Sequence, residues 1–175
     1  MKRVLIDTNV YGELILDEVA TNMLVDLIPS ELIIYGSEIN RTELRDVAKQ
    51  AKLDHRSKRI SLLNLYDFLT QKEKRTYRTT PFIELLSLKY FEEYTRLKGK
   101  KGYELLRKDF IIVATATIHN MDLVVSKDTK TMLSKEAKKA YENLNQRNQL
   151  RIPELLDYAD FKKELERLYN EERTT

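Results

Sequence analysis

The chain has 175 residues, with 31 Lys or Arg and 28 Asp or Glu, so its formal net charge is +3. It has no cysteine and only two histidines, which excludes disulfide frameworks, iron–sulfur clusters, thiol chemistry and zinc sites built from Cys or several His. Its four glycines are too scattered to form a dinucleotide-binding G-x-G-x-x-G loop or a P-loop.

Apolar stretches in the chain are short. The longest, residues 110–118, falls well below the ~20 residues that a membrane span requires. The apolar run near the N-terminus is too short for the core of a signal peptide. We therefore expect a soluble, cytoplasmic protein with no membrane partner, and the lack of cysteine agrees with a reducing compartment.

Strand-like and helical patterns alternate along the first half of the chain. Residues 4–6 are typical of a buried strand, a polar turn at 7–9 can cap a helix, and helical spacing continues to Pro29. A second β-branched run, residues 32–36, ends at a glycine. The apolar stripe of the next predicted helix consists of Leu44, Val47, Ala48 and Ala51.

The middle of the chain is richer in apolar residues. Residues 59–69 predict a helix that is apolar on nearly all sides, and is therefore either deeply buried or half-covered by another chain. Residues 82–98 have helical spacing, with Gly99 suited to the position after the C-cap. Residues 110–118 fit a buried strand or a buried helix equally well by pattern alone.

The last part of the chain continues the alternation. Residues 122–126 predict a strand, followed by a polar turn and a charged helix to about Asn145. Pro153 suits the first turn of a final helix over residues 154–169. Alternating strands and helices with nearly continuous apolar strands predict an α/β fold, with a mostly parallel sheet covered on both faces.

Four acids are candidates for a shared site. Asp7 and Asp128 follow predicted strands, where ligands bind in open α/β sheets; Glu43 is on the apolar side of its helix; Asp109 opens the apolar segment 110–118. Four such carboxylates without basic neighbours would repel one another unless a cation lay among them. Oxygen ligands favour Mg²⁺ or Mn²⁺, which can promote phosphodiester hydrolysis without His, Cys or an organic cofactor.

Each acid also has a purely structural interpretation. Asp7, Asn9, Asp109 and Asp128 are all good N-cap residues at predicted helix starts. Glu43 could pair with Arg45 or Lys49 at the surface, and the nearby acids Glu38 and Asp46 are typical of solvated helix positions. Pattern alone leaves both interpretations open.

Basic residues are concentrated in two segments. Residues 41–78 hold eleven Lys or Arg against five acids, a balance of 11 − 5 = +6, and a second basic cluster spans residues 96–108. Such segregation indicates a polyanionic partner such as RNA. A solvated helix face rich in Lys and Arg would give the same pattern.

Four blocks of the sequence together resemble the PIN-domain nucleases, and most closely the VapC-type toxin ribonucleases and their stand-alone relatives. They span residues 4–10, 37–44, 107–118 and 122–128, in the order of the family. The resemblance implies a three-layer sandwich in which 110–118 is a helix with Asp109 at its start. It also implies Mg²⁺- or Mn²⁺-dependent hydrolysis of RNA that leaves 5′-phosphate and 3′-hydroxyl ends. Carried over by position, the metal-binding and catalytic acids are Asp7, Glu43, Asp109 and Asp128, supported by Thr8, Asn9 and Ser126.

The resemblance also frames the domain organisation and partners. We expect a PIN-like nuclease domain over residues 1–153, with a basic helical insertion at about 49–80, and a C-terminal helical extension over 154–175. Expected partners are an RNA substrate, an antitoxin if the chain is the toxin of a toxin–antitoxin pair, and a second copy through the 59–69 helix. An RNA-processing role is the other enzymatic possibility.

Two other functional classes were considered. A non-catalytic RNA-binding or assembly module would keep the fold without the activity, but intact acids at all four positions count against it. A receiver-type phosphoacceptor domain needs adjacent acids after the first strand and an acceptor Asp after a middle strand, and residues 7–9 and 36–38 provide neither.

Overall fold

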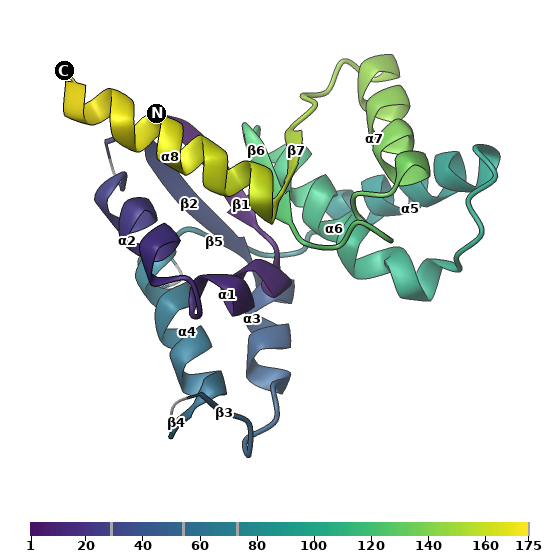
Figure 1. Cartoon of the computed structure of the whole chain (residues 1–175). Coiled ribbons are helices and arrows are strands. Elements are labelled where there is room, and N and C mark those ends of the chain that lie inside the picture. Colours follow the sequence, from purple (N-terminus) through teal and green to yellow (C-terminus); the bar gives the residue numbers. More distant parts are fainter. Residues whose placement is uncertain (29, 54, 73, 175) are drawn as a thin grey trace.

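The computed structural model describes residues 1–28, 30–53, 55–72 and 74–174. A five-stranded sheet lies at the centre, with helices on both sides and a small separate hairpin (Figure 1). In chain order the elements are β1 (Lys2–Ile6), α1 (Thr8–Leu14), α2 (Glu18–Asp26), β2 (Leu32–Ser37), α3 (Glu38–Asp46), β3 (Lys52–Leu53), β4 (Arg56–Ser57), α4 (Lys58–Leu69), β5 (Thr76–Tyr77), α5 (Pro81–Arg96), α6 (Tyr103–Ile118), β6 (Leu123–Ser126), α7 (Lys135–Arg147), β7 (Glu154–Asp157) and α8 (Tyr158–Thr174).

The central sheet has the strand order β5-β2-β1-β6-β7, and neighbouring strands in it pair in parallel. Leu5 of β1 is in register with Tyr35 of β2 on one side and Val124 of β6 on the other. Because parallel strands end at the same edge, the residues that follow β1, β2 and β6 come together there. The predicted α/β class with a mostly parallel sheet is confirmed.

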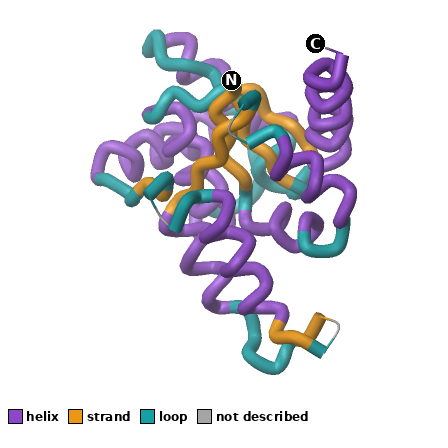
Figure 2. Tube along the Cα trace, turned by 90° about the vertical axis from the view of Figure 1, so that its left-hand side faces the viewer, coloured by secondary structure: helices purple, strands orange, loops and turns teal. Residues whose placement is uncertain are grey.

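Alternate residues of the strands face two separate apolar cores. Val4 and Ile6 belong to the core beneath α1, α2, α4 and α8, whereas Leu5 and Val124 belong to the core beneath α5, α6 and α7. Figure 2 shows the strands between helices on either side. This arrangement is the predicted three-layer sandwich.

The elements before α4 differ from the prediction in two places. The helical pattern before Pro29, which lies outside the described residues, forms two helices, because Asp17 caps a new helix with a hydrogen bond to the Ala20 N–H at 3.0 Å. The helix carrying Leu44 ends at Asp46, since Val47 has an extended ψ of 130°. The predicted apolar stripe beyond Leu44 is therefore wrong.

The predicted helix at 59–69 is confirmed as α4, and its apolar residues divide between two environments. Leu62, Tyr66 and Leu69 are buried in the core, whereas Phe68 is 61% exposed and Ile60 is 56% exposed. The β3–β4 hairpin extends beyond the far ends of α3 and α4, away from the sheet (Figure 1).

Gly99 does not have the role that the sequence predicts for it at the end of α5. Lys98 takes the left-handed conformation after the C-cap, with φ of 64°, and no glycine of the described chain has a positive φ. The N–H groups of Lys98 and Gly99 bond to the Thr95 and Tyr94 carbonyls at 3.0 Å each, which closes a Schellman motif. Gly99 is needed for space, because a Cβ there would lie 2.2 Å from the Tyr94 ring.

Segment 110–118 is helical, as the family resemblance implies, but its helix starts earlier than expected. Helix α6 begins at Tyr103 after Gly102, so Asp109 lies in its second turn and not at its start. The N-cap interpretation of Asp109 is therefore wrong. Asp109 is instead carried within α6, immediately before the buried residues from Phe110 onward.

The C-terminal segment also differs from the prediction. Residues 154–157 form strand β7, which pairs with β6 at the edge of the sheet, so Pro153 precedes a strand rather than a helix. Helix α8 then contributes Phe161, Leu165 and Leu168 to the core under β1.

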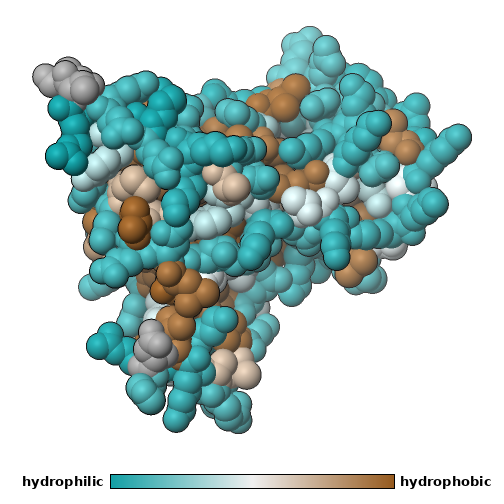
Figure 3. Space-filling model, viewed as in Figure 1, coloured by the Kyte–Doolittle hydropathy of each residue, from teal (hydrophilic) through white to brown (hydrophobic). Residues whose placement is uncertain are grey.

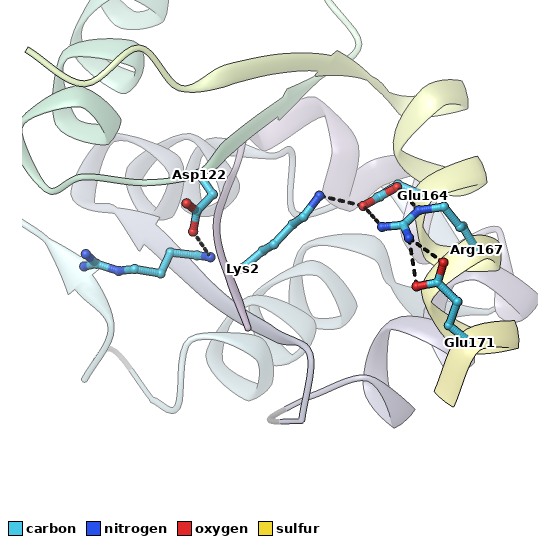
Figure 4. A network of polar contacts seen from close by, with 6 residues as sticks. Lys2, Asp122, Glu164, Arg167 and Glu171 are labelled. Atoms are coloured by element: carbon cyan, nitrogen blue, oxygen red, sulfur yellow. Dashed lines mark hydrogen bonds and ion pairs between the residues drawn. The ribbon is translucent and has the colours of Figure 1, made fainter. Parts of the chain in front are cut away.

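Polar contacts fasten α8 to the start of the chain. Lys2 pairs with Glu164 at 2.7 Å, and Arg167 joins Glu164 to Glu171, while Asp122 accepts the Arg3 N–H at 2.7 Å (Figure 4). The sheet and its first core are therefore completed by the last two elements.

Within the described residues, no helix has the length and apolar character needed to cross a membrane.

Candidate metal centre

Asp7 lies just after β1 and is almost completely buried, with 4% exposure. One carboxylate oxygen accepts the Thr8 N–H at 2.7 Å, so Asp7 does cap α1, and the other accepts the Ser126 hydroxyl at 2.7 Å. The pKa of Asp7 is raised to about 6. Burial is the largest cause and the charges of Glu43 and Asp128 contribute, while the two hydrogen bonds oppose the increase. The N-cap interpretation of Asp7 is therefore confirmed, and the metal-ligand interpretation stays a prediction.

Glu43 reaches the same edge of the sheet from the middle of α3. Its Oε2 accepts the Thr8 hydroxyl at 2.6 Å, and the Asn40 side chain donates to that hydroxyl at 3.1 Å. Its Oε1 accepts the Lys108 ammonium at 2.9 Å. The expectations that Glu43 pairs with Arg45 or Lys49, and that the acids have no basic neighbour, are therefore both wrong.

Asp109 approaches the other acids from α6. Burial raises its pKa to about 7, a hydrogen bond with the Thr131 side chain opposes this, and the charges of Asp7, Asp128 and Glu43 add to the increase. A carboxyl group with this pKa is half-protonated near neutral pH. Its charged form lacks a sufficient counter-charge in the absence of a cation.

Asp128 lies in the turn after β6 and stays ionised. Burial alone would raise its pKa, but hydrogen bonds from the Thr131 hydroxyl and from the N–H groups of Thr131 and Lys130 lower it below the usual value. Helix α7 is capped by Ser134, so Asp128 caps no helix and instead organises its own turn. The structural interpretation of Asp128 as a cap is wrong.

The three predicted supporting residues connect the acids. Ser126 donates to Asp7 and accepts the Asp128 N–H at 3.0 Å, which links the ends of β1 and β6. The Asn9 amide donates to the Ser126 hydroxyl at 3.3 Å and accepts the Lys127 N–H at 2.9 Å. Thr8 connects Asp7 to Glu43.

Four further residues at the site were not predicted. Asn40 and Thr131 each lie three residues after a hydrogen-bonding partner, Ser37 and Asp128, and this spacing is the signal that could have found them. Lys108 is 65 residues from Glu43, a separation at which no local pattern pairs two side chains. The fourth residue is Tyr141.

Tyr141 brings a buried hydroxyl near the acids from α7. Among the described residues its hydroxyl has no hydrogen-bond partner. Burial raises the pKa of Tyr141 well above its usual range, and the charges of Asp109, Tyr90 and Asp128 add to that effect. The ring of Tyr141 packs edge-on against the ring of Phe110, which follows Asp109 in α6, with 5.5 Å between the ring centroids.

The charges of Glu43 and Asp128 contribute to the raised pKa values of Asp7 and Asp109, so the four acids are neighbours, but they do not converge on one point. Within the described part of the chain, no three His, Cys, Asp or Glu side chains are placed to hold one metal ion together. The donors available are oxygens only, which suits a hard cation. Mg²⁺ commonly binds through one or two carboxylates, with water and substrate phosphates completing its shell.

A pocket of about 290 Å³ opens beside Glu43 between α3 and α6. Ile39 and Ile111 contribute apolar surface to it, and Lys108 and Arg107 contribute positive charge. Arg107 pairs with Glu84 at 2.9 Å, outside the acid cluster. The pocket therefore offers both apolar surface and cations next to a candidate ligand.

Comparisons with known proteins agree with the α/β fold described above. The family model described as "PIN domain" matches residues 4–139. No match is found among curated proteins.

Several solved structures share the fold. They include VapBC2 from Rickettsia felis bound to a DNA fragment from its promoter, with 13% identity and a TM-score of 0.58 over 89% of this chain and 98% of that one. DNA-bound VapBC from Salmonella typhimurium has 18% identity and a TM-score of 0.56 over 90% and 98%. VapBC-1 from nontypeable Haemophilus influenzae has 16% identity and a TM-score of 0.53 over 90% and 98%. At these identities the likeness establishes the fold.

Proposed function

This chain belongs to the PIN domain family, and we propose on that basis that it is a Mg²⁺- or Mn²⁺-dependent endoribonuclease. The proposed metal-binding and catalytic residues are Asp7, Glu43, Asp109 and Asp128. The substrate would be RNA and the reaction the hydrolysis of its phosphodiester bonds.

The hydrogen-bond network that joins the acids carries this proposal. Ser126 connects Asp7 to the Asp128 turn, and Thr8 connects Asp7 to Glu43, so carboxylates from three separate elements are held at one edge of the sheet. A fold gains nothing from gathering like charges in a half-buried place unless something else compensates them. A divalent cation provides that compensation.

The donor set fits a hydrated hard cation better than a fully coordinated one. The carboxylates alone do not enclose a single point within the described residues, so water and phosphate oxygens would complete the coordination. The buried hydroxyl of Tyr141, which has no hydrogen-bond partner among the described residues, adds a further polar group beside Asp109 and Asp128.

When bound, the cation supplies Lewis-acid activation of water and stabilises negative charge on the phosphate. The residues around it have separate tasks. Ser126 and the Thr8 N–H fix the orientation of Asp7, and the Thr131 hydroxyl and N–H fix that of Asp128. In the cation-free protein burial raises the pKa of Asp109 to about 7, so binding of the cation by this carboxyl group would release a proton at neutral pH.

We further propose that the chain is the toxin of a toxin–antitoxin pair, with an antitoxin protein as its partner. The solved structures of similar fold are VapBC assemblies. The chain also has a groove of about 550 Å³ between α1, α2, the hairpin and α4, whose apolar lining is Leu14, Ile15, Leu53 and Leu65. Figure 3 shows apolar surface over this region. Such a groove suits a segment of a protein partner.

The outer face of α4 supports the proposal of a homodimer. Phe68 and Ile60 are large, apolar and more than half exposed, whereas Leu62, Tyr66 and Leu69 of the same helix are buried in the core. The basic segment 41–78 supports the approach of RNA, and its hairpin residue Arg56 is exposed.

The non-catalytic module is a second candidate, because one specific observation favours it. Within the described residues, no three of the acids are arranged to hold one metal ion together. A PIN-like module that binds RNA without cutting it would show the same feature. RNA binding would then depend on the basic residues and not on the acids.

An RNA cleavage assay distinguishes the two candidates. We expect cleavage of a single-stranded RNA with Mn²⁺ or Mg²⁺, its loss after chelation, and its loss by orders of magnitude in Asp7→Asn. Asp26→Asn is the matched control, because Asp26 is exposed on α2 and far from the cluster in the chain. If the wild-type protein binds the RNA but does not cleave it with either metal, the nuclease proposal is wrong and the non-catalytic RNA-binding module is favoured.

A test in cells addresses the toxin proposal. Expression of the wild-type chain in a bacterium should stop growth, and Asp7→Asn should relieve the arrest at equal protein levels. Normal growth with an active, soluble wild-type enzyme would instead favour an RNA-processing role.

A further inference from the structure

The ammonium group of Lys108 occupies one oxygen of a proposed metal ligand. Its Nζ lies 2.9 Å from Glu43 Oε1, while Thr8 donates to Oε2, so both oxygens of Glu43 are engaged. Lys108 directly precedes Asp109 in α6. One residue pair therefore spans α3 and α6, the two helices that bring Glu43 and Asp109 to the site.

The two partners of Glu43 are not equally secured. Thr8 is held by Asn40, whose side chain donates to its hydroxyl at 3.1 Å, and Asn40 is completely buried. The Lys108 side chain is 58% exposed, against 26% for Glu43. An exposed ammonium loses little when it returns to water, so Lys108 is the partner that can be displaced.

We propose that Lys108 is a tethered counter-ion that competes with the divalent cation for Glu43. This inference rests on the proposed function, since it requires Glu43 to be a ligand. In the cation-free protein, the lysine neutralises Glu43 and holds it toward α6. A cation that coordinates Glu43 Oε1 would lie close to the ammonium on that oxygen, so the two positive groups would repel each other and compete for the carboxylate.

The competition has a functional consequence. Lys108 lowers the affinity for the cation and so raises the cation concentration at which the site fills. Once released, its ammonium lies at the wall of the 290 Å³ pocket that Glu43 also lines. The lysine therefore sets a threshold for activation without belonging to the set of ligands.

The chain provides a matched control in the adjacent residue. Arg107 is also cationic and 44% exposed, and it pairs with a glutamate at 2.9 Å. Its partner, however, is Glu84 of α5, which is outside the proposed ligand set. Lys108→Gln and Arg107→Gln therefore remove the same charge from neighbouring positions, and only the first removes a competitor for Glu43.

The experiment is a calorimetric titration of the metal-free protein with Mn²⁺ alone, in the absence of RNA. We expect Lys108→Gln to bind Mn²⁺ about tenfold more tightly than the wild type. Arg107→Gln should change the affinity by about twofold or less, through long-range charge only. Equal affinities in the two variants would overturn the proposal.

A double-mutant cycle with Glu43→Gln isolates the pair. If the lysine acts by competing for Glu43, then Lys108→Gln should have no specific effect when Glu43 is already neutral. An undiminished tenfold effect in that background would show that Lys108 acts elsewhere. Melting of each variant without metal confirms that the exposed substitutions leave the fold intact.

Failure of the proposed function gives a different result. If the wild type, Lys108→Gln and Arg107→Gln all fail to bind Mn²⁺ at about 10 mM, well above the range of weak protein sites, the metal site itself is wrong. If the wild type binds and both variants match it, only the role of Lys108 is wrong.

Discussion

The Ser126 hydroxyl donates a hydrogen bond to Asp7 Oδ2 at 2.7 Å, so the last residue of β6 holds a buried carboxylate that follows β1. The same oxygen of Ser126 accepts the Asp128 N–H at 3.0 Å. One hydroxyl therefore fixes two proposed ligands. The stability of this arrangement can be measured without any metal or substrate.

Replacement of Ser126 by Ala should destabilise the metal-free protein by about 1–3 kcal/mol at pH 8, because a buried carboxylate loses a hydrogen-bond donor. Urea unfolding measures this change. Ser61→Ala is the control, since within the described residues the only hydrogen bond of the Ser61 hydroxyl on α4 is to the nearby Ser57 carbonyl, at 3.3 Å. Equal effects of the two substitutions would show that Asp7 does not depend on Ser126.

The metal-free protein should lose stability as pH rises from 5.5 to 8. The pKa values of Asp7 and Asp109 are raised to about 6 and about 7, so in this window the folded state binds more protons than the unfolded state, whose carboxyls have already ionised. Unfolding free energy should therefore fall by about 3 kcal/mol, roughly 1 from Asp7 and roughly 2 from Asp109, and level off above pH 8. Unfolding in urea across this pH range tests the sign.

Two other groups of residues need to be separated from this effect. The pKa values of Asp17, Glu93 and Glu164 are lowered by their basic partners. Their contribution to the stability of the fold is therefore lost only in solutions more acidic than this window. The pKa of His119 is lowered by burial and by Arg3, and its effect has the opposite sign. Comparison with Asp109→Asn cancels these contributions, and a wild-type slope as flat as that of the variant would contradict the prediction.

Asp109→Asn should show whether Asp109 binds the metal ion or has only a structural role in α6. Asp109 caps no helix, so the neutral amide relieves repulsion from Asp7 and Asp128 at little structural cost, and the variant should melt at or above the wild-type temperature without metal. Mn²⁺ at about ten times its dissociation constant should stabilise the wild type by about 1.4 kcal/mol and the variant by much less. A full metal response in the variant would remove Asp109 from the site.

The outer face of α4 should mediate association. Phe68→Glu places a charge where an apolar contact is proposed, so it should shift a dimer toward monomers in analytical ultracentrifugation at micromolar concentrations. Phe82→Glu is a matched control, because Phe82 on α5 is 59% exposed, close to the 61% of Phe68. A wild-type protein that is monomeric at high micromolar concentration would exclude the dimer.

Phosphate contacts by the basic segment should make RNA binding sensitive to salt. Replacing Arg56, Lys58 and Arg59 by Ser should reduce the slope of log K against log salt by about 2, since each contact with a single strand contributes about 0.7. The three lysines within residues 135–139 on α7 provide a control triple substitution. An unchanged slope would show that the hairpin end of α4 faces away from the RNA.

Local pattern was sufficient for the parts of the site that lie at strand ends. Asp7 and Asp128 follow short buried strands, and a parallel sheet brings such positions to one edge. The helix of Asp109 was identified only through the family resemblance, because nine apolar and small residues suit a buried strand equally well. Its early start at Tyr103 could not be predicted from segment 110–118 itself.

Long-range contacts account for the remaining differences. Residues 154–157 become a strand because β6 offers them a free edge, and a proline before them is compatible with either a strand or a helix. The pairing of Lys108 with Glu43 depends on how α6 packs against α3, which no local pattern specifies. The expected domain division at residue 153 is likewise a statement about packing that sequence pattern does not decide.

The central position of β1 has a consequence for synthesis on the ribosome. Strand β1 pairs with β6, about 120 residues later in the sequence, and Lys2 can pair with Glu164 only after α8 has been made. A nascent chain that has not yet exposed Ser126 therefore has no partner strand on one side of β1 and no donor for Asp7 Oδ2. The acid cluster therefore assembles late in translation, and incomplete chains released early would carry the basic segment without a formed acid cluster.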